Sequence, residues 1–224
     1  ASLMTESGVE VQIQNAGVVS FRDAAQDSPL LLWKGLKLDG YNFGSSEEVS
    51  SAHDTLPRGL SSSADGRRWR TPLMEVEPDL LVSRELYVPA QGRGYVRVLE
   101  KFFNISDRDI EARPAFSSSG NFSSDYAVES SSEDESLSSE DSWLRLRERP
   151  YEGESLSSRM SLGHVFADEA GKQALDAERM YVEGSSWQTA YKLTVPSGDH
   201  RVVMHFIALE NSTGRGDTLQ VLRS

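Results

Sequence analysis

Alternation of apolar and polar residues is the strongest signal in this chain, and it is clearest between residues 79 and 116. One stretch separates its side chains onto two faces, with Val82, Arg84 and Leu86 on one and Ser83, Glu85 and Tyr87 on the other. Because successive side chains of a strand point to opposite faces, this pattern predicts a sheet with one wet face. We expect three extended strands here, joined by short turns.

The same two-residue rhythm predicts strands elsewhere. Residues 9–13 and 18–21 flank the turn Asn15-Ala16-Gly17, which indicates a hairpin. Residues 189–195 and 202–209 flank Pro196-Ser197-Gly198-Asp199, a sequence typical of a hairpin loop. A single helix is predicted over 168–180, where alanines recur at helical spacing.

Together these elements predict an all-β fold. We expect two packed antiparallel sheets, with at most one short helix, forming a single domain over residues 1–224. Long, acidic, Ser-rich loops are predicted at 44–70 and 117–142, because these stretches hold too little apolar surface to order themselves.

Charge and composition restrict the partners. The chain has 23 Lys and Arg against 35 Asp and Glu, a formal charge of −12, which argues against nucleic-acid binding. No apolar run approaches the roughly 18 residues that cross a bilayer, so membrane insertion is not expected. The absence of cysteine excludes disulfides, thiolate catalysis and cysteine-bound zinc.

The expected location is outside the cytoplasm: secreted, periplasmic or on the cell surface. The first residues, ASLMTESG, lack the basic and apolar regions of a secretory signal. We therefore expect that any signal peptide has already been removed.

Aromatic residues are the first candidate for binding. Four of them, in or beside the predicted loops, could form a platform on which sugar rings stack: Trp69, Trp143, Tyr41 and Tyr151. The alternative interpretation is that these rings anchor the loops to the core.

Acidic residues offer a second candidate site, because calcium takes hard oxygen ligands from loops between strands. The candidate ligands are Asp107, Asp109, Glu133, Asp134 and Glu135. Their spacing is not that of a dedicated calcium loop, and the alternative is a solvated acidic coil. A third interpretation makes Ser130, Ser131 and Ser132 phosphorylation sites that add charge to the segment. No other cofactor is expected.

No complete catalytic motif occurs in the sequence. Its four histidines are scattered, and His205, between Met204 and Phe206, is interpreted as a packed, hydrogen-bonded core residue. Carboxylates such as Glu75, Glu77 and Glu100 leave a paired-carboxylate glycoside chemistry open.

Several segments carry a resemblance to known proteins. They are residues 18–43, LLVSRELYVP (80–89), YVRVLEKFFNISDRDIEA (95–112), SGNFSSD (119–125) and YKLTVPSGDHRVVMHFIAL (191–209). Their order resembles β-sandwich modules of large bacterial secreted and surface proteins, and the layout is similar to the supersandwich of galactose-mutarotase-like and polysaccharide-active proteins. No matching catalytic His and Glu pair stands in context, so the resemblance implies a non-catalytic module.

The sequence therefore favours a binding or structural module that contacts a polysaccharide or another protein through its loops. A carbohydrate-active enzyme of the supersandwich type, using paired carboxylates, is the first alternative. An interaction domain ordered by calcium or by phosphorylation around residues 130–141 is the second.

Overall fold

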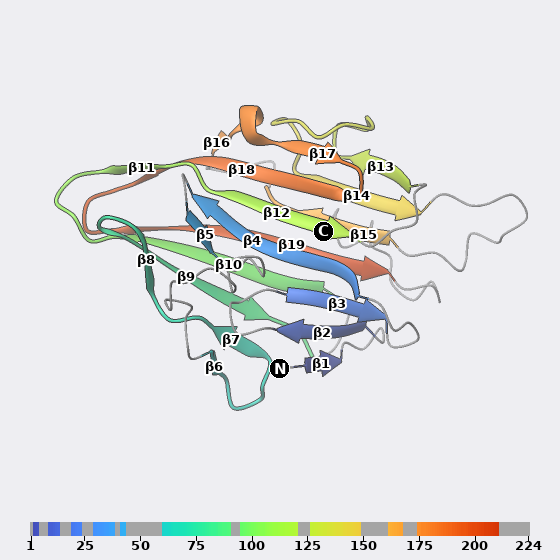
Figure 1. Cartoon of the computed structure of the whole chain (residues 1–224), viewed down its shortest axis with the longest axis horizontal. Coiled ribbons are helices and arrows are strands. Elements are labelled where there is room, and N and C mark those ends of the chain that lie inside the picture. The colour runs from blue at the N-terminus through green and yellow to red at the C-terminus, as the bar shows by residue number, and fades with distance from the viewer. Residues whose placement is uncertain are drawn as a thin grey trace, which may run out of the picture.

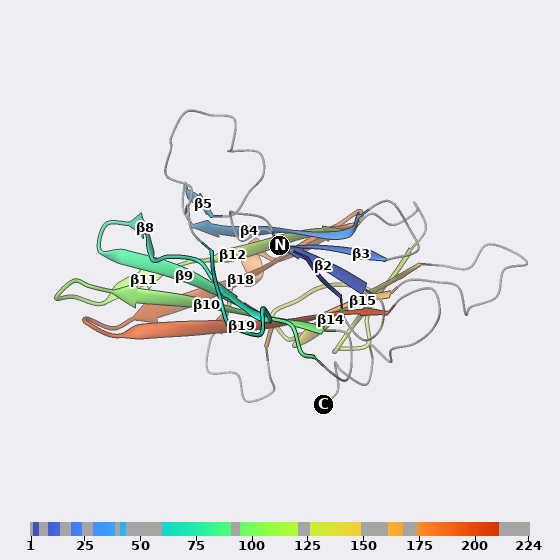
Figure 2. The same cartoon turned by 90° about the horizontal axis from the view of Figure 1, so that it is seen from below.

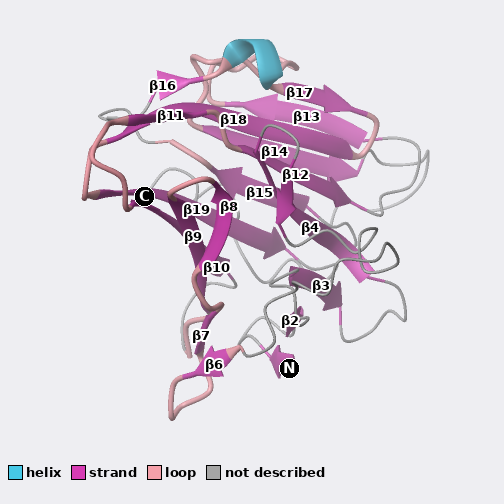
Figure 3. Ribbon diagram, turned by 60° about the vertical axis from the view of Figure 1, so that its left-hand side comes forward, coloured by secondary structure: helices cyan, strands magenta, loops and turns pink. Residues whose placement is uncertain are grey.

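The computed structural model describes residues 2–4, 9–13, 19–23, 29–38, 41–43, 60–90, 95–120, 126–148, 161–167 and 174–210. The strands are β1 (Ser2–Met4), β2 (Val9–Ile13), β3 (Val19–Asp23), β4 (Pro29–Leu38), β5 (Tyr41–Phe43), β6 (Ser61–Ser62), β7 (Arg68–Arg70), β8 (Met74–Glu77), β9 (Leu80–Tyr87), β10 (Tyr95–Asn104), β11 (Ile110–Ala112), β12 (Ala115–Gly120), β13 (Tyr126–Ser130), β14 (Trp143–Glu148), β15 (Ser161–Val165), β16 (Ala174–Leu175), β17 (Tyr181–Glu183), β18 (Ser186–Val195) and β19 (His200–Glu210). One turn of 3-10 helix, η3, spans Ala177–Arg179 (Figure 3). The predicted all-β class is confirmed.

Over the described residues, the strands form two antiparallel sheets that face each other (Figures 1 and 2). The ten-stranded sheet has the order β1-β2-β3-β4-β12-β18-β11, with β5 beside β4 and with β16 and β17 beside β18. The nine-stranded sheet has the order β13-β14-β15-β19-β10-β9-β7-β6, with β8 beside β9. The hairpin predicted near the N-terminus is present, because β2 pairs with β3.

The hairpin predicted across Pro196–Asp199 is wrong in its pairing, although both of its strands are present. β18 pairs with β11 and β12 in one sheet, whereas β19 pairs with β10 and β15 in the other. The turn itself has the expected chemistry, with Gly198 at a φ of +64°. Turn chemistry reverses the chain but does not choose the partner of each strand, and here the turn carries the chain from one sheet to the other.

The two long loops are shorter than predicted. In the first, residues 44–59 lie outside the described part, but β6 and β7 form a hairpin within residues 61–70. In the second, β12 and β13 occupy 115–120 and 126–130, so that the loop between β13 and β14 spans 131–142. Serine is compatible with a strand when its hydroxyl has a partner, and Ser117 Oγ donates to Gln188 Oε1 at 3.0 Å.

The helix predicted over 168–180 is reduced to η3, and residues 168–173 lie outside the described part. Ala174 and Leu175 instead pair with Lys192 and Tyr191 of β18. Edge pairing and an ion pair between the buried carboxylate of Asp176 and Arg113, at 2.5 Å, outweigh the weak helix propensity. Among the described residues, no helix is long and apolar enough to cross a bilayer.

The core lies between the two sheets and follows the period of two. Along β10 every even-numbered residue from Val96 to Asn104 is buried and every odd-numbered residue is half-buried. The core residues contributed by the nine-stranded sheet include Leu80, Val82, Leu86, Val96, Val98, Phe102, Leu144, Leu146, Leu162, Val203 and Ile207. They pack against a facing set from the other sheet that includes Phe21, Leu36, Phe116, Trp187 and Tyr191.

This core also contains a polar cluster on the inner face of the nine-stranded sheet. Arg84 and Glu100 lie opposite each other on β9 and β10, and Arg84 Nε lies 2.5 Å from Glu100 Oε1. Both side chains are fully buried. Burial raises the pKa of Glu100, and the adjacent Arg84 guanidinium opposes this shift.

Two histidines adjoin this ion pair. His164 of β15 and His205 of β19 are fully buried, with 3.0 Å between His164 Nε2 and His205 Nδ1. Trp187 Nε1, which can only donate, bonds His164 Nδ1 at 3.1 Å, so the proton of neutral His164 is on Nε2 and points at His205. Burial lowers the pKa of His164 to about 3, and burial with the nearby His164 and Arg84 lowers that of His205. The prediction that His205 is a packed, hydrogen-bonded residue is confirmed.

We predict that the fold loses stability as the pH falls below about 6.5. Each buried histidine stays neutral in the folded chain but binds a proton in the unfolded chain, so the unfolded state gains protons first. Each should lower the free energy of unfolding by about 1.4 kcal/mol per pH unit, for His164 between its unfolded pKa and about 3. Glu100, with its raised pKa, acts in the opposite direction.

Comparison of variants isolates the histidine contribution. Between pH 6 and 4, H164Q should reduce by about one the number of protons that the chain takes up on unfolding. The slope of the unfolding free energy against pH should fall accordingly, by about 1.4 kcal/mol per pH unit. The control H200Q alters a half-exposed histidine at the start of β19. It should leave the slope of the unfolding free energy against pH close to that of wild type. Equal slopes in wild type and H164Q, measured by urea denaturation, would refute the assignment.

Candidate functional site

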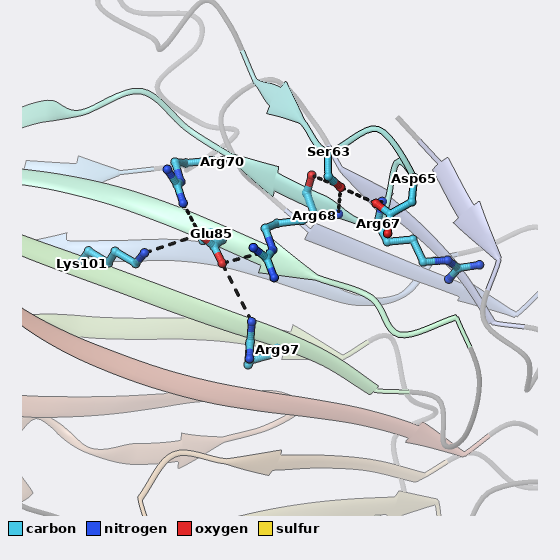
Figure 4. A network of polar contacts seen from close by, with 8 residues as sticks. All are labelled: Ser63, Asp65, Arg67, Arg68, Arg70, Glu85, Arg97 and Lys101. Carbon is cyan, nitrogen blue, oxygen red and sulfur yellow. Dashed lines mark hydrogen bonds and ion pairs between the residues drawn. The ribbon is translucent and has the colours of Figure 1, made fainter.

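The outer face of the nine-stranded sheet carries a cluster of charged residues supplied by β7, β9 and β10 (Figure 4). The β6–β7 hairpin supplies two arginines of the cluster, Arg68 and Arg70. Its turn is stabilised by a hydrogen bond from Ser63 Oγ to Asp65 Oδ1 at 2.5 Å, and Gly66 in the turn adopts a φ of +66°. β7 then pairs with β9, which places Arg70 opposite Glu85.

Glu85 is the centre of this group, which we call the Glu85 cluster: Glu85, Arg68, Arg70, Arg97 and Lys101. The Glu85 side chain is 6% exposed, and its Oε2 lies 2.7 Å from Arg70 Nη2 and 3.5 Å from Lys101 Nζ. Its Oε1 lies 3.6 Å from Arg68 Nε and 3.9 Å from Arg97 Nη2. Four cations therefore share one carboxylate, and only the Arg70 contact is a short hydrogen bond.

The electrostatics of the cluster keep Glu85 ionised. Partial burial raises the pKa of Glu85, but the hydrogen bond from Arg70 and the charges of Lys101, Arg70 and Arg68 outweigh it and hold the pKa below its usual value. Tyr87 orients two of the cations, because the guanidinium carbons of Arg68 and Arg97 lie 5.9 and 5.2 Å from its ring centre.

From this cluster a row of cationic, aromatic and aliphatic residues crosses six neighbouring strands. Strand register places its members side by side in the order Arg68, Tyr87, Arg97, Phe206, Val165 and Trp143. Each position alternates with residues of the core, so the row belongs to the outer face. With adjacent strands about 4.8 Å apart, the row is roughly 24 Å long. Tyr95 stands edge-on to Phe206, with ring centres 5.7 Å apart.

The two described tryptophans of the predicted aromatic platform lie on opposite faces of the nine-stranded sheet. Trp69 is buried in the core at 6% exposure, opposite Leu86, so it anchors the β6–β7 hairpin and offers no stacking surface. Trp143 lies half-buried in the outer-face row. Tyr41 lies on β5, with its side chain outside the described part, and Tyr151 falls in an undescribed segment.

The predicted acidic ligands lie in two different loops. Asp107 and Asp109 follow β10, and Asp109 Oδ1 accepts a hydrogen bond from Ser197 N. Glu133, Asp134 and Glu135 follow β13, where Asp134 Oδ1 accepts bonds from Ser130 Oγ and Ser136 N. Within the described ranges, no three His, Asp or Glu side chains come together to hold a metal ion.

The carboxylates predicted for catalysis lie in different environments. Glu100 is buried with Arg84 in the interior, away from any surface-bound sugar. Glu75 and Glu77 lie on β8 at the margin of the sheet, and Glu75 Oε1 accepts a hydrogen bond from Asp79 N.

The Glu85 cluster was not identified from the sequence. Its signal was present, since Glu85 and Tyr87 alternate with the inward-facing residues of β9, and Arg97 does so on β10. The sequence does not predict that β7 pairs with β9. This pairing adds Arg68 and Arg70 from a segment predicted to be a loop.

Known proteins resemble this chain in fold only. No protein-family model and no curated sequence matches it. Heparan sulfate lyase HepC (a mutant) from Pedobacter heparinus is similar over 92% of this chain and 34% of its own, with a TM-score of 0.54 and 7% identity. A galactose mutarotase-like protein from Lactobacillus casei is similar over 93% of this chain and 100% of its own, with a TM-score of 0.52 and 9% identity. The chain thus spans about a third of the lyase and the whole of the mutarotase-like protein.

We predict that Glu85 stabilises the sheet by separating four like charges. E85Q should lower the free energy of unfolding by about 1–3 kcal/mol, because the cations lose their shared partner. The Glu85 pKa is lowered, so this stabilisation is present at neutral pH and lost as the pH falls below about 4.5.

E111Q serves as the control, since it removes the same charge from an exposed position on β11 of the other sheet. It should change the free energy of unfolding by less than about 0.5 kcal/mol. Equal denaturation midpoints for E85Q, E111Q and wild type at neutral pH would contradict the role assigned to Glu85.

Proposed function

We propose that this chain is a polysaccharide-binding domain of a secreted or surface-exposed protein, and that the outer face of the nine-stranded sheet is its binding surface. The observation that carries the proposal is the row from Arg68 to Trp143. In it, flat cationic and aromatic side chains stand on neighbouring strands of one rigid sheet.

The chemistry of the row suits sugars. The aromatic rings offer apolar surface to the C–H faces of a sugar ring, and guanidinium groups donate hydrogen bonds in a fixed plane to hydroxyl or acidic oxygens. A row of roughly 24 Å contacts a polymer better than a single small molecule, which would instead fill an enclosed pocket. The sheet also holds these groups in place before binding, which lowers the entropic cost of association.

The structural neighbours support the choice of a carbohydrate. One is named for heparan sulfate cleavage and the other for its likeness to galactose mutarotases. Shared fold does not by itself assign shared activity, so this support is added to the chemistry of the face and does not replace it.

A carbohydrate-active enzyme is the second candidate, favoured by the match over the entire length of the mutarotase-like protein. Polarimetry tests it directly: catalysis would speed the interconversion of galactose anomers above the spontaneous rate. A rate that falls in E85Q and not in E111Q would place such catalysis at the Glu85 cluster.

We predict that the rings of the row contribute to polysaccharide affinity. Y87A and W143A should each weaken binding by about 5- to 50-fold, because each removes a large contact surface, Tyr87 near one end of the row and Trp143 at the other. The control is Y181A, which removes a more exposed aromatic ring from β17 of the other sheet.

The measurement is affinity gel electrophoresis against soluble galactan, xylan, dextran, polygalacturonate and heparin, with thermal melts to check folding. Retardation by at least one of these polymers, reduced by Y87A and W143A but not by Y181A, is the expected result. Absence of retardation by every polymer, or equal losses in all three variants, would refute the binding surface.

A further inference from the structure

We propose that the ligand of the outer face is an anionic polysaccharide, and that the Glu85 cluster binds its sulfate or carboxylate groups. This inference rests on the proposed function and names the substrate class of the same surface. It is carried by the charge balance of the cluster, its exposure and the geometry of its donors.

The cluster holds more positive charge than its own carboxylate neutralises. Four cations surround Glu85, and three of the four contacts are 3.5 Å or longer. The local charge is thus strongly positive in a chain whose overall charge is −12. Because exposed charges are screened beyond about 8 Å at physiological salt, a ligand at this face responds mainly to the cluster.

The donors of the cluster are accessible. The side chains of Arg68 and Arg70 are 53% and 54% exposed, and those of Arg97 and Lys101 are 29% and 25% exposed. An oxyanion placed on the solvent side of Glu85 would meet several donors that Glu85 leaves unused.

Tyr87 adds geometric selectivity. Its ring lies between Arg68 and Arg97 in the strand register and contacts both guanidinium groups. The two forks are therefore oriented before a ligand arrives, and Arg forks bind carboxylate and tetrahedral oxyanions with two parallel hydrogen bonds. Farther along the face, Arg145 and Arg147 both contact Glu129 at 3.2 Å.

A sugar polymer with widely spaced acidic groups fits this arrangement better than nucleic acid does. One compact cluster matches an acidic group that recurs at intervals along a polymer, with neutral ring surface between, and Phe206 and Trp143 lie in the same row for that surface. Nucleic acid carries a phosphate at every nucleotide and is usually bound by an extended basic surface, which a net charge of −12 opposes.

The test compares four polymers. Heparin carries both sulfate and carboxylate groups, dextran sulfate carries sulfate, polygalacturonate carries carboxylate, and dextran is neutral. We expect at least one anionic polymer to bind at least about 10-fold more tightly than dextran, and binding to weaken as sodium chloride rises from 0.05 to 0.5 M. R70A/K101A should reduce this affinity by about 10- to 100-fold. R68A removes a single cation that is more weakly paired with Glu85 than Arg70 is, so it should show a smaller loss of affinity. A loss in R68A, which changes only one residue, cannot be attributed to misfolding of the double variant.

The control R108A/R201A removes one positive charge from the turn after β10 and one from the start of β19, both outside the cluster, and should bind as wild type does. Binding to dextran sulfate alone or to polygalacturonate alone would support the proposal and identify the acidic group as sulfate or carboxylate. Equal losses in the control, or equally tight binding of a DNA duplex, would overturn it. Preference for a neutral polysaccharide would overturn this inference while leaving the proposed function intact, whereas binding to no polysaccharide would remove both.

Discussion

The register of β10 is the constraint on which both the core and the outer face depend. This strand pairs with β9 on one side and β19 on the other, and its ten residues alternate strictly between buried and half-buried positions. Glu100 therefore faces the interior, while its neighbour Lys101 faces the Glu85 cluster. A shift by one residue would bury the ammonium group of Lys101 and remove it from the outer face, because a slip of one position exchanges the two faces.

The buried ion pair penalises such a slip. Arg84 and Glu100 lie directly opposite each other, so a slip of β10 by one position would turn Glu100 to the outer face and leave Arg84 in the interior without its partner. Leaving a buried charge unpaired costs about 3–5 kcal/mol, a large share of the stability of an ordinary domain. The histidine pair next to it imposes a second condition, since His164 and His205 meet only if β15 and β19 are in register. The buried polar groups of this sandwich thus specify the register of its strands, and the buried histidines lower the stability of the fold at acidic pH.

The sequence predicted what alternation alone determines. The fold class, the N-terminal hairpin and the strands β9, β10, β18 and β19 could be read from it, including the face on which Arg84 lies. It could not predict which strands pair across long separations: the turn after Val195 has hairpin chemistry yet separates two sheets, and His164 meets His205 across 41 positions. The candidate site was missed for the same reason, because the Glu85 cluster exists only when a short strand at residues 68–70 docks on β9.

The proposed binding surface lies on the sheet and not on the loops that the sequence favours for recognition. In the described loop between β13 and β14, the buried carboxylate bonds within the loop. Asp141 is almost fully buried, and it accepts hydrogen bonds from Ser131 Oγ and from the backbone amides of Ser132 and Ser138. Burial alone would raise the Asp141 pKa, yet these bonds hold it below its usual value, so the carboxylate is already satisfied. The cations around Glu85 are in the opposite state, since one carboxylate serves four of them. An exposed group of cations that is short of counter-charge therefore gains more from an incoming anion than a loop whose buried carboxylate is already satisfied.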